Sequence, residues 1–296
     1  MGTLREQLAD FTVDEVLDRV FSGHGEHLYL FVEKRGLNTK DVQRVLAQHY
    51  GVQLVDVSYS GLKDKRAITR QWFSIRLPKT AQEPKHEQFS ILEETKHDRK
   101  LRRGDHQENR FHIRIRDVSN NDQLSAHTLQ QPLPNYFGPQ RFGYQQNNLS
   151  QALDWVAQSQ PRIKRGVRAL NLSVLRSFVF NEVLASRVRS GTWSTPVNGD
   201  VLADNCPTGP LWGRGRLSTS KKALTVEQAV RRRHNMVCDA LEWVGLNQER
   251  RPLVMHASDV EIQREDDTIE LRFSLPKGSY ATIALHEYFD VKEARA

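Results

Sequence analysis

One stretch of the chain concentrates residue types that could do nucleophilic or acid–base chemistry. It runs from Ser60 to Trp72 and holds one acidic residue, Asp64, among the cations Lys63, Lys65, Arg66 and Arg70. Nearby cations favour the charged form of a carboxyl group, so Asp64 is predicted to be a carboxylate at neutral pH. A carboxylate can act as a nucleophile or as a general base. The spacing alone, however, favours a structural salt bridge in a cationic turn.

The motifs of several other reaction classes are absent from the sequence. No Gly-x-Gly-x-x-Gly follows a predicted strand, no GxxxxGK[ST] phosphate loop is present, and no Gly-x-Ser-x-Gly nucleophile elbow occurs. The His-x-Glu and Pro-Cys-x-x-Cys pattern of zinc deaminases is also missing. His24, Glu26 and His27 lie in a polar, glycine-containing turn, where a surface loop is favoured over a metal site. The sequence therefore predicts no metal site.

The composition indicates a large, polar, globular protein. Its 296 residues carry 43 Lys and Arg against 36 Asp and Glu, a net charge of +7. No apolar run is long enough to span a bilayer, and the first ten residues lack the apolar core of a signal peptide. The two cysteines, Cys206 and Cys238, are too few for a disulfide framework. We therefore expect a cytoplasmic protein outside the membrane, with an acidic partner such as a nucleic acid.

Three basic clusters support that expectation. They are Lys96, Arg99, Lys100, Arg102 and Arg103; then Arg162, Lys164, Arg165 and Arg168; and then Arg231, Arg232 and Arg233. A single run of this kind is usually a solvated face. Three runs in different segments of a net-basic chain favour a phosphate-binding groove. The sequence does not say which clusters line that groove or whether they share a face.

The elements that must position Asp64 mix strands and helices without a regular βαβ rhythm. Strands are predicted at 28–32, 72–77, 111–116, 260–262 and 269–275, from apolar runs and alternation. Helices are predicted from a cap at Asn38 or Thr39 to Gly51, at 149–156, at 171–188, at 224–245 and after Ser279. This order predicts an α+β domain built from both ends of the chain, with a more helical domain inserted between them.

Two longer motifs resemble one family. Residues 61–71, GLKDKRAITRQ, resemble the signature GxKDxxAxTxQ of the TruD family of tRNA pseudouridine synthases, and residues 135–143, NYFGPQRFG, match its NYFGxQRFG. Residues 10–15 and 275–282 are similar to the family's DFxVxE and LPxGSFAT, and Asn109 opens an Asn-x-Phe at a strand start. The resemblance thus extends from about residue 10 to about residue 290.

The resemblance implies a fold and an activity. The expected fold is α+β: a pseudouridine-synthase catalytic domain with a mixed or antiparallel sheet, formed by 1–148 and 256–296, and an inserted TruD-specific α/β domain at 149–255. The expected enzyme is an isomerase that converts uridine to pseudouridine in tRNA, at uridine thirteen in the D-stem region. The implied partner is tRNA, and a body of two domains that clasps RNA alone suggests a monomer.

The resemblance also implies site residues. Asp64 matches the catalytic aspartate. The positions that match nucleotide contacts or flank the aspartate are Phe11, Lys63, Asn109, Phe111 and Tyr280. Tyr280 stands where the family more often has Phe, so stacking is kept but the hydroxyl needs a partner. Lys63 is expected to keep Asp64 ionised or to bind a phosphate.

The implied reaction cleaves a C–N glycosidic bond, turns the uracil and joins its C5 to the same sugar carbon. It involves no redox change and no group donor, so we expect no cofactor. The uridine must leave the base stack, with an aromatic face to hold it. The sequence does not separate covalent attack by Asp64 from removal of a sugar proton. A non-catalytic RNA-binding protein or chaperone of the same fold, and a hydrolase that releases uracil, stay open as alternatives.

Overall fold

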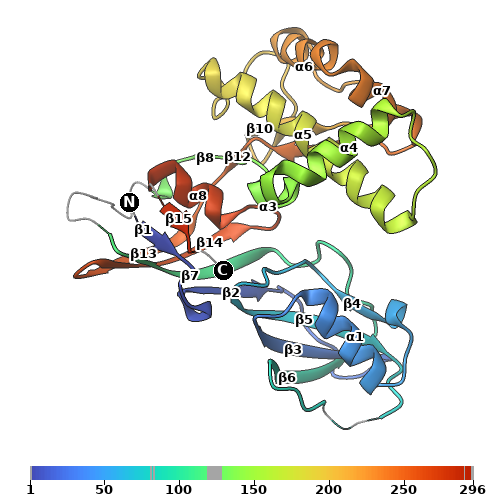
Figure 1. Cartoon of the computed structure of the whole chain (residues 1–296), viewed down its shortest axis with the longest axis vertical. Helices are drawn as coiled ribbons and strands as arrows, with labels where there is room; N and C mark the ends of the chain where they lie inside the picture. Colours follow the sequence, from blue (N-terminus) through green and yellow to red (C-terminus); the bar gives the residue numbers. More distant parts are fainter. Residues whose placement is uncertain (1, 81, 83, 119–128, 290, 295–296) are drawn as a thin grey trace. The chain divides into compact units, whose positions relative to one another are not determined.

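The computed structural model describes residues 2–80, 82, 84–118, 129–289 and 291–294 (Figure 1). The chain forms two compact units. Unit 1 comprises residues 1–131, 257–278 and 288–296, and unit 2 comprises residues 132–256 and 279–287. Both units combine helices and strands, which confirms the predicted α+β class. The domain boundaries expected at 148/149 and 255/256 are a different division of the chain and stay a prediction.

Unit 1 is built on a mixed sheet that has ten strands in the described residues. The main path runs β13 (Ser258–Glu265), β14 (Thr268–Pro276), β7 (Glu108–Arg116), β2 (Phe11–Val16), β5 (Ile68–Arg76), β3 (His27–Arg35) and β6 (Phe89–His97). Off this path lie β1 (Gly2–Leu4), β15 (Val291–Glu293) and β4 (Val57–Tyr59). The pairs β2–β5 and β1–β15 are parallel, and the others are antiparallel. Segments from both ends of the chain therefore complete one sheet.

Strand β7 shows why this sheet forms. Its apolar residues Phe111, Ile113 and Ile115 alternate with polar ones, so every second side chain reaches the same face. In register, Phe111 lies opposite Val13 of β2 on one side and Phe273 of β14 on the other. The apolar face becomes part of the core, whereas the basic face keeps partial exposure. The alternation that predicted this strand is confirmed.

Helix α1 (Thr39–His49) covers part of the sheet in unit 1 (Figure 1). Its buried face, with Val42 and Leu46, packs in a core with Phe73 of β5. The helix ends before Gly51, whose φ of +63° is the left-handed conformation that glycine adopts without strain. The predicted helix is confirmed, although neither predicted cap donates or accepts a capping hydrogen bond through its side chain.

Unit 2 holds most of the helices. They are α3 (Pro139–Phe142), α4 (Asn147–Ala157), α5 (Arg165–Arg189), α6 (Lys221–Arg233), α7 (Asn235–Trp243) and α8 (Ala281–Tyr288). Its short strands are β8 (Leu133–Pro134), β9 (Leu202–Ala203), β10 (Cys206–Leu211), β11 (Glu249–Pro252) and β12 (Val254–Met255). Of the helices in the described part of the chain, none has the length and apolar character needed to cross a membrane.

The single helix predicted over 224–245 is wrong: the structure divides it into α6 and α7. At His234 the backbone leaves helical geometry, with φ −120° and ψ 38°. The His234 ring lies 3.1 Å from a carboxylate oxygen of Glu182 and packs edge-on against Phe178, both on α5. The break lets the apolar face of α7, with Leu241, turn into the core that α4 and α5 form. Periodicity does not change at such a break, so it carried no signal.

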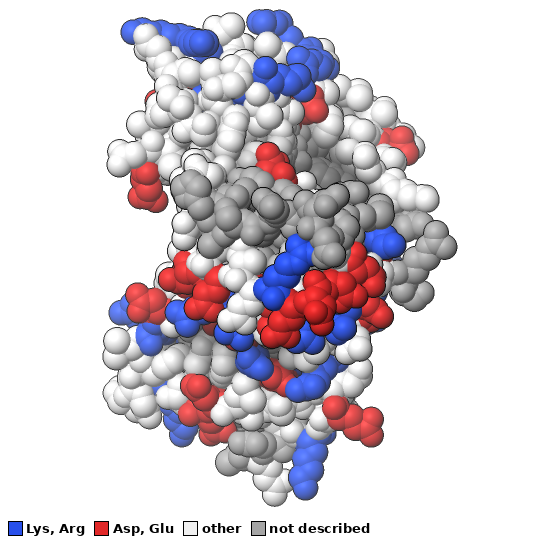
Figure 2. Space-filling model, turned by 90° about the vertical axis from the view of Figure 1, so that its left-hand side faces the viewer, with Lys and Arg blue, Asp and Glu red and all other residues white. Residues whose placement is uncertain are grey.

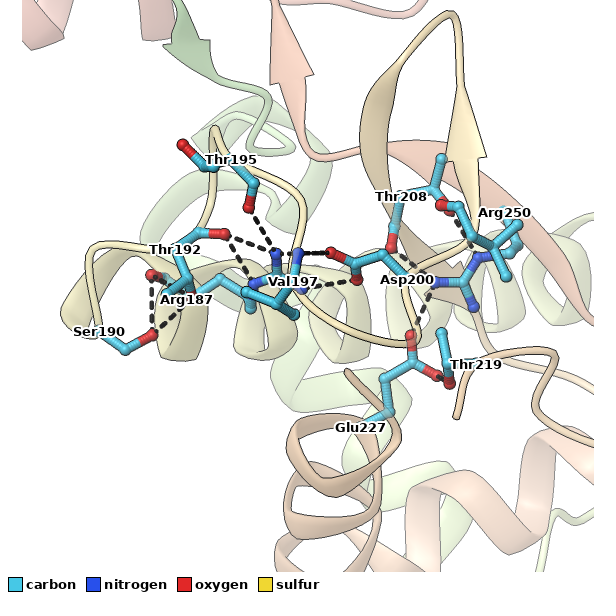
Figure 3. Close-up of polar contacts among 11 residues, drawn as sticks. Arg187, Ser190, Thr192, Thr195, Val197, Asp200, Thr208, Thr219, Glu227 and Arg250 are labelled. Atoms are coloured by element: carbon cyan, nitrogen blue, oxygen red, sulfur yellow. Dashed lines mark hydrogen bonds and ion pairs between the residues drawn. The ribbon is translucent and has the colours of Figure 1, made fainter. Parts of the chain in front are cut away.

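A buried polar network orders the Gly- and Pro-rich stretch that follows α5 (Figure 3). Arg187 donates to both carboxylate oxygens of Asp200, at 2.8 and 2.9 Å, and to the carbonyls of Thr192 and Thr195. Asp200 in turn accepts the backbone N–H of Val197 at 2.7 Å. Because a charged pair this deeply buried has its bonds satisfied, we regard the network as structural.

Candidate active site around Asp64

Asp64 lies in the loop between β4 and β5 in unit 1. Its side chain is 29% exposed, so a ligand can reach the carboxylate. In the described part of the chain only Oδ2 has a protein partner, and Oδ1 accepts no hydrogen bond. The loop thus presents one carboxylate oxygen held by the protein and one available to a substrate.

Motif residues hold the loop backbone in place. Thr39, the first residue of α1, accepts the backbone N–H of Lys63 through Oγ1 at 3.0 Å. The same hydroxyl donates to Oε1 of Gln71 at 2.9 Å, and Nε2 of Gln71 donates to the carbonyl of Gly61 at 3.0 Å. Thr39 and Gln71 are fully buried, so these bonds are shielded from water. Thr39, one of the two residues predicted as the helix cap, therefore bonds to the Asp64 loop instead.

A buried lysine, Lys34, anchors the carbonyl of the aspartate itself. Its Nζ donates to the Asp64 carbonyl at 2.7 Å from strand β3. Burial lowers the pKa of Lys34 to about 8, opposed by the charge of Asp64 and reinforced by that of Lys63. The sequence analysis missed this residue. The available signal was a lysine near the end of a strand that is otherwise mostly apolar.

The partner of the Asp64 carboxylate is Arg5, which the sequence analysis also missed. The Arg5 guanidinium donates to Oδ2 of Asp64 at 2.9 Å, and only 2% of its side chain is exposed. It lies over the ring of Phe11, 3.9 Å from the centroid, and forms a second ion pair with Glu293. One buried cation is therefore shared by two carboxylates and packed on an aromatic face.

The two ends of the chain meet at this pair. Parallel pairing of β1 with β15 sets Leu4 opposite Glu293, next to Arg5. Arg66, from the same loop as Asp64, donates to the carbonyl of Ala294 at 2.9 Å and to the carbonyl of Arg5 at 3.2 Å. The geometry of Asp64 thus depends on both terminal strands.

Lys63 pairs with a residue other than Asp64. Its Nζ lies 2.5 Å from a carboxylate oxygen of Glu15, and both side chains are buried. Nearby, His106 bonds through Nδ1 to the Ser60 hydroxyl at 2.6 Å. Burial, and then the charge of Lys63, lowers the pKa of His106 to about 4, so the ring is neutral at neutral pH. The expected substrate contact of Lys63 stays a prediction. The positive charge of Lys63 is compensated by Glu15.

The predicted aromatic residues of unit 1 lie together in the core. Phe11 and Phe111 meet edge to face with centroids 6.2 Å apart, and Phe111 stacks on Phe273 at 5.4 Å. Asn109, on the same strand as Phe111, is buried, and its Oδ1 has no hydrogen-bond partner among the described residues. An unpaired buried acceptor is costly, so it is the kind of atom that a bound ligand satisfies.

Tyr280 belongs to unit 2, whereas the other predicted site residues belong to unit 1. Its ring packs on the second motif: it lies 6.2 Å from the Phe137 ring, edge to face. A Cβ atom at Gly138 would lie 3.2 Å from Cδ1 of Tyr280, so a larger residue there would press on the Tyr280 ring. Arg251, missed by the sequence analysis, lies 4.2 Å from the Phe137 centroid and bonds Asn135. Phe137 and Gly138 of the second motif therefore pack against the Tyr280 ring.

Comparison with known proteins identifies the fold and then the family. The crystal structure of a putative tRNA pseudouridine synthase D (TruD) from Methanosarcina mazei superimposes with a TM-score of 0.66 and 20% identity, over 98% of this chain and 94% of that chain. This likeness shows the fold. A family model described as tRNA pseudouridine synthase D (TruD) matches residues 1–151 and 205–288.

Relatives with closer sequences agree. A tRNA pseudouridine synthase D of Pseudomonas putida strain W619 is 39% identical over 99% of this chain and 93% of its own length. That of Pseudomonas syringae pv. syringae strain B728a is 40% identical over 98% of this chain and 92% of its own length. The chain therefore belongs to the TruD family, whose members are enzymes of the isomerase class, and the resemblance found in its motifs is confirmed.

Proposed function

We propose that the protein is a tRNA pseudouridine synthase that uses Asp64 as its catalytic carboxylate and acts on uridine thirteen in the D-stem region of tRNA. The observation that carries the proposal is the state of Asp64. It lies in the family's signature loop, is partly exposed, and is bonded through one oxygen to the buried Arg5. Family membership supports the reaction, and the ion pair supports the choice of residue.

Two routes use such a carboxylate. In the first, a free carboxylate oxygen bonds to C1′ of the ribose as the C1′–N1 bond breaks and uracil leaves with the electron pair. The uracil turns, C5 displaces the carboxylate from C1′, C5 loses its proton and N1 gains one. In the second, the carboxylate removes a proton from the sugar carbon next to C1′ as the C1′–N1 bond breaks and uracil leaves with the electron pair. After the uracil turns, C5 bonds to C1′ and the proton returns to the sugar. C5 then loses its own proton and N1 gains one. Both routes need an ionised, reachable oxygen.

The surrounding residues supply charge and recognition in this proposal. Arg5 holds the Asp64 carboxylate from a buried position, and a charge-assisted hydrogen bond of this kind is strong. Asn109 accepts a hydrogen bond from the uracil edge through its unpaired Oδ1. Phe11 and Phe111 are the aromatic contacts proposed in unit 1 for the flipped base, and Tyr280 is the one proposed in unit 2. Lys63 supports the loop through Glu15. The enzyme works in the cytoplasm as a monomer and needs no cofactor.

The variant Asp64→Asn tests the proposal. We expect it to lose pseudouridine formation while it folds and binds tRNA, because the amide keeps the shape and removes the nucleophilic charge. Pseudouridine is mapped by carbodiimide-dependent reverse-transcription stops on tRNA. Asp14→Asn is the matched control, since Asp14 lies in the same unit, is 38% exposed and is also paired to an arginine, Arg70. Appreciable activity of Asp64→Asn would refute the assignment.

The same assay separates the alternatives. If the wild-type protein binds tRNA but forms no pseudouridine, the chain is a binding protein of this fold. If free uracil is released, it is a hydrolase. Stops at a position other than uridine thirteen would keep the reaction and correct the target.

A further inference from the structure

Unit 1 carries two surface grooves that differ in charge compensation. The larger, of about 660 Å³, lies over β2, β7 and β14. Its arginines have acidic partners: Arg70 lies 3.1 Å from Asp14 and 2.8 Å from Glu33, and Arg272 lies 3.6 Å from Glu261. Over unit 1, Figure 2 shows the same pattern, with basic and acidic side chains interleaved. This groove has little uncompensated charge to offer a polyanion.

The smaller groove, of about 360 Å³, lies beside strand β4, which leads into the Asp64 loop. Its lining includes no acidic residue. It includes three buried apolar or aromatic side chains and three more exposed cations: Val57, Tyr59 and Leu101, and Lys100, Arg102 and Arg103. The groove therefore has an apolar base and a cationic rim.

Two of the three rim cations are held in place by uncharged partners. Arg103 lies over the Tyr59 ring, 4.1 Å from its centroid, and donates to the Tyr59 hydroxyl at 2.7 Å. Lys100 donates to the carbonyl of Val55 at 2.7 Å. Within the described ranges, none of the ion pairs includes Lys100, Arg102 or Arg103. Ordering two of the cations in advance reduces the entropy lost when an anion binds.

We propose that this groove binds the phosphodiester backbone of the tRNA close to the target nucleotide. The inference rests on the proposed function, which supplies the RNA. The loop that carries the cations is tied to the catalytic loop, because the backbone N–H of Gly104 donates to the carbonyl of Ser60 at 2.9 Å. Arginine forks match phosphate oxygens bidentately, and lysine contributes a point charge. The groove thus places a phosphate anchor beside the segment that leads to Asp64.

The third basic cluster in the sequence is a weaker candidate for this role. Arg231 lies 2.8 Å from Asp239, and Arg233 lies 3.3 Å from Glu182. Its charge is thus partly compensated, as it is in the larger groove of unit 1. This contrast favours the cluster around Lys100 and Arg103 over the third cluster. Only the former lines a described groove beside the segment that leads to Asp64.

Two triple variants of the full chain test the groove against general electrostatics. Lys100, Arg102 and Arg103 are replaced by Gln in one, and Arg110, Arg114 and Arg272 by Gln in the control. Both remove three positive charges from unit 1. We expect the first variant to weaken tRNA binding roughly 10-fold or more. We also expect the negative slope of log K for tRNA association against log salt to become shallower by about 2, because fewer counterions are released. We expect the control to change little, and the first variant to keep its turnover at saturating tRNA.

Each outcome decides the proposal. Unchanged binding of the first variant, or an equal loss in both variants, would overturn it. Arg102→Glu guards against misfolding, because Arg102 is exposed and its hydrogen bonds within the described residues use its backbone alone. Its N–H donates to Oδ2 of Asp105, and its carbonyl accepts the backbone N–H of Asp105. This single change should weaken binding on its own, and wild-type affinity would overturn the proposal. The proposed function is tested by a different measurement. It fails if the wild-type protein forms no pseudouridine, whereas the groove proposal is tested by tRNA affinity.

Discussion

At the scale of residues, the candidate site depends on two buried cations with different tasks. Arg5 neutralises the Asp64 carboxylate, and Lys34 holds the Asp64 carbonyl. Arginine stays charged when buried, whereas a lysine ammonium readily loses its proton there. The stability of the fold is therefore expected to depend on whether the Lys34 ammonium is protonated.

The variant Lys34→Met makes that linkage measurable. The pKa of Lys34 is about 8 in the folded protein, against its ordinary 10.5. Between these values the unfolded chain holds one more proton than the folded chain, so wild-type stability rises with pH relative to the variant, by about 1.4 kcal/mol per pH unit. Urea unfolding of both proteins from about pH 7 to about pH 10 checks this. A stability difference that stays constant above pH 8 would show that the Lys34 pKa is not lowered.

At the scale of elements, the long helix α5 depends on its last turn. Arg187 and Asp200, 3% and 2% exposed, join this turn to the loop that follows (Figure 3). Breaking a buried pair by removing one charge is costly, because the remaining charge loses its partner in a place without water.

We therefore expect Asp200→Asn to lower the free energy of unfolding of unit 2 by about 3–5 kcal/mol. Chemical denaturation followed by tryptophan fluorescence measures the change. Asp239→Asn is the control, because Asp239 also pairs with an arginine at 2.8 Å but is 52% exposed, and an exposed pair contributes about 1 kcal/mol or less. Equal losses in the two variants would contradict this explanation.

At the scale of the whole molecule, the first and last strands of the chain meet beside Asp64. Strand β15 supplies Glu293 to Arg5 and the Ala294 carbonyl to Arg66. The C-terminal segment is therefore expected to position the pair of Arg5 and Asp64, the proposed catalytic carboxylate, although it lies more than two hundred residues from Asp64 in the sequence.

Removing residues 291–296, or making Glu293→Gln, should lower turnover about 10-fold at unchanged KM for tRNA, because small misplacements of reacting groups are costly. Single-turnover assays on tRNA measure this. Glu293→Asp should restore part of the rate, and Lys292→Gln, next to it on the exposed strand, should leave the rate unchanged. If Glu293→Gln turns over tRNA as fast as the wild-type protein, Glu293 does not position the site.

Features that depend on residues close together in the chain were predictable from the sequence. Alternation identified β7, and spacing with a terminal glycine identified α1. The residues of one motif identified Asp64, because the loop that presents it is a continuous segment. In a helix or a strand the direction of the side chains repeats at a fixed spacing. The positions of the apolar residues in the sequence therefore show which type of element forms and which of its faces is buried.

The pairing of charges, by contrast, depends on contacts between distant segments of the chain. Arg5 bonds Asp64 across 59 positions and Glu293 across 288. Lys63, next to Asp64 in sequence, instead turns to Glu15. Ion pairs of this kind follow from strand register and strand order in the sheet, which hydrophobic periodicity does not specify. A sequence motif can therefore indicate a candidate catalytic carboxylate without indicating which cation pairs with it.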